Sequence, residues 1–123
     1  MMKTKKNVVI VSSLFLILGT LGNVAYAETW SVTEGANYEW VGQWTRQGNT
    51  NQFSCQQRSS HGSSLTATII VNENGQMVSA QKTNSSDGNN CNYSGVRNGD
   101  AIEGTYFCSN GGPYKWSARI SNM

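Results

Sequence analysis

The chain has 123 residues, with nine lysine or arginine residues, seven acidic residues, one histidine and three cysteines. This length allows one small domain whose thin core would gain from a covalent cross-link. The basic residues beyond position 27 stand apart from one another, so the sequence lacks the clustered positive charge of a nucleic-acid-binding surface, and we expect no nucleic-acid partner.

The first 27 residues are typical of a secretory signal peptide. Lysines among the first six residues precede an apolar run from Val8 to Leu18, and Ala25-Tyr26-Ala27 has the spacing of a cleavage site. The run is shorter than the roughly 20 residues that cross a bilayer, so we expect no membrane span after cleavage. Cleavage would leave one domain, residues 28–123, in a secreted or periplasmic location.

The composition after residue 27 predicts an all-β domain. Ten aromatic residues are spread among many Thr, Ser, Asn, Gln and Gly residues. Apolar residues alternate with polar ones in segment after segment, and no window keeps helical spacing for more than a turn. Residues 28–36 fit neither of the two folds considered below, a barrel and a sandwich, and we interpret them as an N-terminal arm.

The first predicted strands alternate clearly. Residues 38–46 place Tyr38, Trp40 and Trp44 on one inward face. After a turn at residues 48–51, a second strand at 52–58 turns Phe53 and Cys55 inward. Residues 59–64 read as a loop.

A third strand at residues 65–71 leads into a predicted hairpin. Asn74-Gly75 predicts a type I′ turn, in which Val71 would oppose Val78 and Ile69 would oppose Ala80. Residues 84–90 contain no apolar side chain and predict an exposed, mobile loop.

A second hairpin around Asn98-Gly99 pairs residues 91–96 with 101–109 and places Tyr93 opposite Gly104. A turn at 110–113 then precedes a last strand at 114–120. About seven antiparallel strands joined by short turns must hide their edges, which favours a meander closed, or nearly closed, into a small up-and-down barrel. An immunoglobulin-type sandwich is the alternative, but it needs longer crossovers.

Three cysteines in an exported chain predict one disulfide and one free thiol, with three pairings open. We favour Cys91–Cys108, because the second hairpin places the two diagonally on one face, where a bulge or wider turn would bring them together. Cys55 would then be a buried free thiol.

No combination of residues supports catalysis or metal binding convincingly. Cys55 with His61 lacks an orienting third group, and the Ser59–Ser64 loop reads as solvated rather than as a hydrolase site. Of the carboxylates, Glu39 and Glu103 fall on outer faces and Asp100 falls in a turn. The histidine and cysteines match no metal-ligand spacing. We therefore expect a protein that is not an enzyme and needs no cofactor or metal.

The large number of aromatic residues is the feature of the sequence that says most about function. Some of these rings would fill the core, and others would line a barrel mouth and stack on a flat ligand. The predicted ligand-binding residues are Trp40, Trp116, Tyr114 and Tyr38.

Gly42-Gln43-Trp44 and Arg119 resemble the calycin pattern of lipocalins and avidins. There a G-x-W opens the first strand, and a basic residue near the end packs across the Trp ring at the closed end. The resemblance covers two short segments and implies a ligand-binding barrel without enzymatic activity, in which Arg119 would lie against Trp44.

Two functions follow as hypotheses. The first is a non-enzymatic binding barrel outside the cytoplasm, whose open end, formed by turns such as 84–90 and 109–113, recognises a small molecule, glycan or envelope component. The alternative is a protein-interaction module, such as a secreted or periplasmic hydrolase inhibitor, with a solid interior. A pocket inside the barrel would favour the first.

Overall fold

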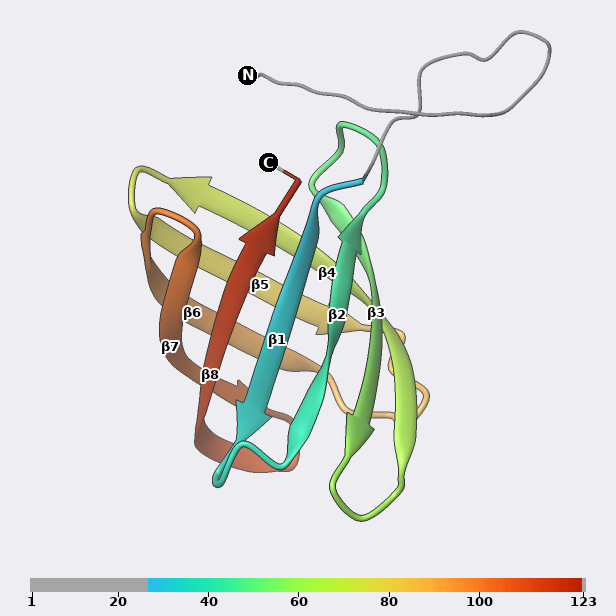
Figure 1. Ribbon diagram of the computed structural model, residues 1–123. Helices are drawn as coiled ribbons and strands as arrows, with labels where there is room; N and C mark the ends of the chain where they lie inside the picture. The colour runs from blue at the N-terminus through green and yellow to red at the C-terminus, as the bar shows by residue number, and fades with distance from the viewer. Residues whose placement is uncertain (1–26, 123) are drawn as a thin grey trace, which may run out of the picture.

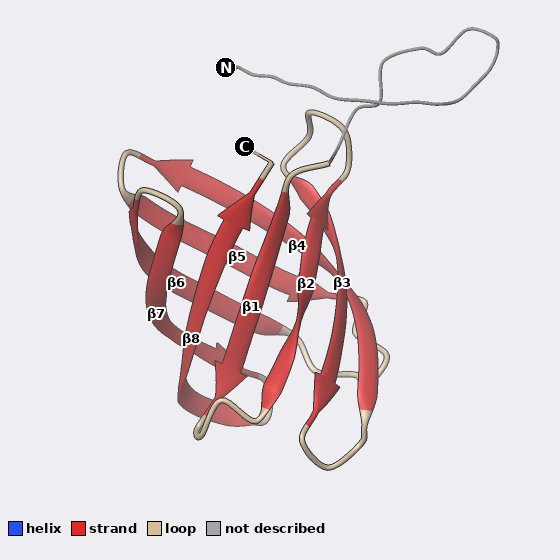
Figure 2. Cartoon of the chain, in the orientation of Figure 1, coloured by secondary structure: helices blue, strands red, loops and turns tan. Residues whose placement is uncertain are grey.

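The computed structural model describes residues 27–122, so the predicted signal peptide up to residue 26 lies outside the described residues, as does Met123. The described chain is all-β (Figures 1 and 2). Its strands are β1 (Thr29–Gly35), β2 (Trp40–Arg46), β3 (Gln52–Ser59), β4 (Ser64–Asn74), β5 (Met77–Thr83), β6 (Cys91–Asn98), β7 (Ala101–Cys108) and β8 (Gly111–Ser121). No helix among these residues is long and apolar enough to cross a membrane.

The strands form a closed antiparallel barrel. Each strand pairs with its neighbours in sequence, and β8 returns to pair with β1, so every edge is covered (Figure 1). This confirms the predicted barrel. The strand count is eight because residues 29–35, interpreted from the sequence as an arm, form β1 and close the sheet. Their alternation is hard to recognise because the third inward residue after Trp30 and Val32 is the charged Glu34.

Both predicted hairpins exist, but each register differs from the prediction by two residues. Val71 pairs with Ala80 rather than Val78, and Tyr93 pairs with Tyr106 rather than Gly104. In each hairpin a glycine is the first of the two turn residues. It is Gly75 in one hairpin and Gly99 in the other, and each has a positive φ. Only the first turn residue then needs positive φ, which is the requirement of a type II′ turn rather than type I′. A shift of two keeps every side chain on its predicted face.

Three tryptophans form the centre of the core. The rings of Trp30 and Trp116 stack on either side of Trp44, with centroids 5.8 and 5.6 Å apart, and all three are fully buried. Phe53 packs edge-on against Trp30 at 5.2 Å, as its predicted inward face requires. Offset stacked and edge-on arrangements are those that aromatic quadrupoles favour.

Gly95 makes room for the third of these rings. Gly95 pairs with Gly104, and a Cβ on Gly95 would lie 3.0 Å from Trp116. The indole N–H of Trp116 donates to the Ser94 carbonyl at 3.0 Å. The ring that lies over Gly95 is therefore Trp116.

Charged residues close the barrel end that holds the β2–β3 turn. The Trp30 indole N–H donates to Glu28 at 2.7 Å, and Arg46 pairs with Glu28 at 3.1 Å while lying over the Phe53 ring. Arg119, expected from the calycin resemblance to lie against Trp44, is instead exposed on the outer face and pairs with Asp100 at 3.2 Å.

The predicted disulfide is present. Cys91 and Cys108 are directly opposed on β6 and β7 and are bonded, and Cys55 is a buried free thiol. Because the true register is shifted by two, the two cysteines face each other without the bulge between β6 and β7 that the predicted register needed. The cross-link closes the hairpin at the end of the barrel opposite Glu28.

Candidate functional site at the barrel mouth

Four connections meet at the end of the barrel opposite Glu28, which we call the mouth (Figure 1). They are the turn after β1, the β3–β4 loop, the β5–β6 loop and the β7–β8 turn, because alternate connections of a meander lie at the same end. The predicted contributors to an open end, residues 84–90 and 109–113, lie here together, although β8 already begins at Gly111 within the second of them. The Ser109 N–H donates to the Asn90 carbonyl at 2.8 Å, so the loop is tied to the turn.

A pocket of about 290 Å³ opens at this end, and we call it the mouth pocket. Its lining combines the rings of Trp40, Tyr106 and Tyr114 with acidic side chains and one lysine, Lys82. Ring contacts connect the mouth pocket with the core. The ring centroid of Tyr106 lies 5.3 Å from that of Tyr114 and 4.7 Å from that of buried Tyr93, on which it stacks. The volume suits a ligand near the lower end of the small-molecule range.

A buried ion pair forms the floor of the mouth pocket. Lys82 on β5 and Glu34 on β1 have side chains only 4% exposed, and Nζ lies 3.1 Å from Oε2. The Tyr93 hydroxyl donates to the same carboxylate at 2.9 Å, and Lys82 also donates to Gln57 Oε1 at 2.6 Å. We call Glu34, Gln57, Lys82 and Tyr93 the buried polar cluster.

Gly42 makes room for this cluster. A Cβ there would collide with the backbone carbonyl of Gln56 and lie 2.7 Å from Gln57 Cα and Cγ. The bare glycine therefore lets β3 approach β2 and lets the Gln57 side chain reach inward toward Lys82. The Cys55 thiol donates to Gln57 Oε1 at 3.4 Å, and desolvation by burial raises the Cys55 pKa to about 12.

Tyr93 of the cluster and its stacked neighbour Tyr106 are held in their protonated form. Burial is the largest cause that raises the pKa of Tyr93, and the negative charge of Glu34 adds to it. The same two causes, in the same order, raise the pKa of Tyr106. Both hydroxyls therefore remain hydrogen-bond donors at neutral pH.

The buried pair is a poor source of net stability. Desolvating two charges costs about as much as their attraction returns, so apolar residues of similar size would stabilise such a site equally well or better. Buried ionisable groups of this kind, next to a pocket, are typical of functional sites. The cluster therefore marks the mouth as the candidate site.

Two carboxylates, half-buried Glu39 and exposed Asp87, lie at the rim of the mouth pocket, and we call them the rim carboxylates. A hydrogen bond from the Asn37 N–H, at 2.9 Å, is the main cause that lowers the Glu39 pKa. For Asp87, partial burial acts to raise the pKa, but hydrogen bonds from Ser85 and Asn89 and the charge of Lys82 outweigh it. Both are therefore ionised at neutral pH.

The structure places the four predicted ligand-binding residues in three settings. Trp40 and Tyr114 are half-buried and line the mouth pocket. Trp116 is fully buried between Trp44 and Tyr93, so it offers no ring face to a ligand. Tyr38 is 44% exposed in the β1–β2 turn and is not among the residues that line the mouth pocket.

The residues considered for nucleophilic chemistry are kept apart. Cys55 is buried inside the barrel, whereas His61 is exposed in the β3–β4 loop. Ser59 caps that loop, since its Oγ accepts from the N–H groups of His61 and Ser63 at 3.2 and 3.1 Å. Within residues 27–122, no three His, Cys, Asp or Glu side chains gather to hold a metal ion.

The sequence reasoning missed the buried polar cluster, although a signal was present. Glu34 continues the inward alternation of Trp30 and Val32, Gln57 follows Cys55 by two residues, and Lys82 follows Ala80 by two. Strict alternation would have turned all three inward. Their polarity argued against burial when each strand was considered alone.

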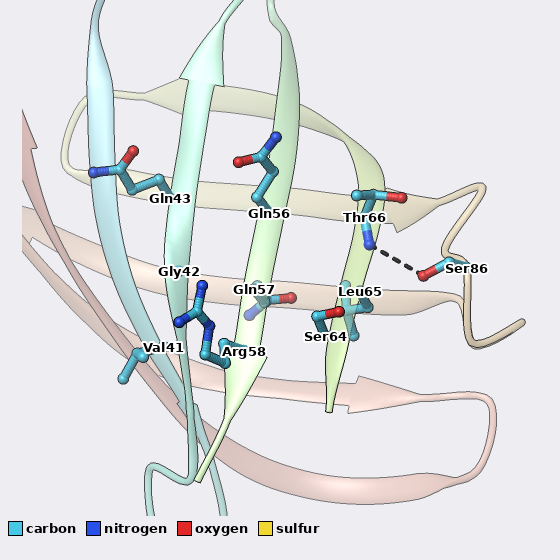
Figure 3. A pocket seen from close by; sticks show the side chains of 10 residues that line it. All are labelled: Val41, Gly42, Gln43, Gln56, Gln57, Arg58, Ser64, Leu65, Thr66 and Ser86. Carbon is cyan, nitrogen blue, oxygen red and sulfur yellow. Dashed lines mark hydrogen bonds between the residues drawn. The ribbon is translucent and has the colours of Figure 1, made fainter. Parts of the chain in front are cut away.

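A second hollow, of about 530 Å³, lies over β2, β3 and β4 (Figure 3). Outward side chains such as Gln43, Gln56 and Arg58 border it, and the Thr66 N–H donates to Ser86 Oγ at its edge. Its lining contains no aromatic ring and no carboxylate, so it offers less for a specific ligand than the mouth pocket does.

Comparison of the chain with protein-family models, curated proteins and solved structures finds no match.

Proposed function

We propose that this protein is a non-enzymatic binding barrel that holds a small polar ligand in the mouth pocket and works outside the cytoplasm. The observation that supports it most is the pairing of half-buried rings, Trp40 and Tyr114, with a buried ion pair at the floor of one pocket. The rings provide apolar contact area, and the charged and hydroxyl groups fix orientation through hydrogen bonds.

The interior is not solid throughout, which favours this function over a protein-interaction module. The tryptophan stack fills the half of the barrel near Glu28, and the mouth half retains about 290 Å³. The Cys91–Cys108 disulfide supports a location where thiols are oxidised.

Calorimetric titration with a panel of monosaccharides tests this proposal. Trp40→Ala and Tyr114→Ala should each weaken binding by on the order of 1–2 kcal/mol, roughly 5–30-fold in affinity, because each removes a stacking face. Tyr38→Ala is the matched control, since this ring is exposed at the same end but lies outside the pocket lining. Unchanged affinity in both mouth variants, with folding verified by circular dichroism, would overturn the proposal.

A further inference from the structure

The mouth pocket has more negative than positive charge. Glu34, Glu39 and Asp87 line it together with a single lysine, Lys82. Lys82 is already paired with Glu34 at 3.1 Å, whereas no ion pair of the described residues includes either rim carboxylate. A cationic group entering the pocket would therefore meet two carboxylates whose charge is not yet neutralised.

These charges act on the space of one pocket. The charge of Lys82, at the floor, contributes to the lowered pKa of Asp87 at the rim. The charge of Glu39 contributes to the raised pKa of Tyr106, whose ring lines the wall. All of these residues line one pocket of about 290 Å³, so a single small molecule placed in it can contact floor, wall and rim.

The floor offers hydrogen-bond donors as well. An ammonium has three N–H donors, and Lys82 donates two of them to Glu34 and Gln57. The hydrogen bonds within residues 27–122 leave the third N–H of Lys82 without an acceptor, and Lys82 lines the mouth pocket. A buried donor without an acceptor is costly, so this end of the site favours a ligand that presents oxygen.

We propose that the ligand is an amino sugar of monosaccharide size, an inference that rests on the proposed function of the mouth pocket. Its ammonium lies between the rim carboxylates, a hydroxyl oxygen accepts from Lys82, and a face of its ring stacks on Trp40. A neutral sugar would leave the rim charges unmatched, and a simple alkylammonium would leave the donors at the floor without an acceptor. The aromatic walls also attract a cation, which strengthens the preference.

Three probes separate these contributions by calorimetry at about pH 6 and low salt: glucosamine, glucose and cyclohexylammonium. Glucosamine should bind about fivefold more tightly than glucose, the effect of two partly exposed ion pairs. It should also bind more tightly than cyclohexylammonium, which has no hydroxyl groups. Glu39→Gln combined with Asp87→Asn should abolish the preference for glucosamine over glucose. Glu103→Gln, an exposed carboxylate outside the mouth pocket, is the matched control.

Each other result overturns the inference. Equal affinity for glucose and glucosamine, still dependent on Trp40, would refute the amino sugar and leave mouth binding intact. If the double variant still prefers glucosamine over glucose, the rim carboxylates do not bind the ammonium group. Cyclohexylammonium binding as tightly as glucosamine would refute the role of the floor donors. Failure of all three probes to bind would overturn both the amino sugar and the proposed function.

Discussion

Removing the lysine of the buried polar cluster should destabilise the protein far more than removing the whole ion pair. Lys82→Met leaves the Glu34 carboxylate, only 4% exposed, without its cationic partner, while the Tyr93 hydroxyl still donates to it. Stranding a buried charge in this way costs about 3–5 kcal/mol. That is a large share of the roughly 5–15 kcal/mol by which a domain of this size is stable.

The double variant Lys82→Met with Glu34→Gln should recover most of this loss. The new amide oxygen can still accept from Tyr93, and no unpaired charge remains. The residual cost should be about 1–2 kcal/mol, because the Gln57 carbonyl loses the donor 2.6 Å away.

Urea unfolding followed by tryptophan fluorescence measures both variants. Lys115→Met, which replaces an exposed lysine on β8, serves as control and should change the unfolding free energy by less than about 0.5 kcal/mol. If the single and double variants were equally destabilised, or if Lys82→Met cost less than about 1 kcal/mol, the assignment of Glu34 and Lys82 as a charged buried pair would be wrong.

Four further outcomes are expected. Gly42→Ala should lose about 1–3 kcal/mol of stability in urea melts, because its Cβ meets the β3 backbone; no loss would contradict the close approach of β2 and β3. Reducing Cys91–Cys108 should cost about 3 kcal/mol, measured by unfolding with and without reductant, and an unchanged midpoint would argue against its clamping the hairpin. Cys55 should resist alkylation at about pH 8 until the protein unfolds, since it is buried and its pKa is about 12, and rapid native labelling would show an accessible thiol. Glucosamine affinity should weaken as pH falls through the pKa values of the rim carboxylates, which lie below their ordinary 4.5 and 3.8, and a loss already complete at about pH 5 would point to another group.

Alternation along each strand predicted the inward faces well, because it depends only on local geometry. Phe53, Cys55 and Ile69 are buried as their positions require. The register was less accessible, since Asn74-Gly75 is compatible with two turn types that differ by two residues and keep the same facing. Barrel closure depends on β1 meeting β8, a contact between the two ends of the domain that no local pattern encodes.

The candidate site was only partly predictable for a related reason. Trp40 and Tyr114 could be proposed from their type and position, whereas Trp116 looked equivalent until the stack with Trp44 placed it in the core. Glu34 and Lys82 lie 48 residues apart in sequence, and each looks unfavourable on an inward face until the other is seen beside it. A buried pair of this kind is visible only after the barrel is closed.

Nuclear magnetic resonance of the tryptophan indole N–H groups tests the central claim most directly, because the four rings occupy distinct places. Titration with glucosamine should shift the Trp40 resonance progressively to saturation and leave those of Trp30, Trp44 and Trp116 nearly unchanged, since only Trp40 lines the mouth pocket. A saturable response confined to backbone amides around the outer hollow of β2, β3 and β4, with Trp40 unmoved, would contradict binding at the mouth.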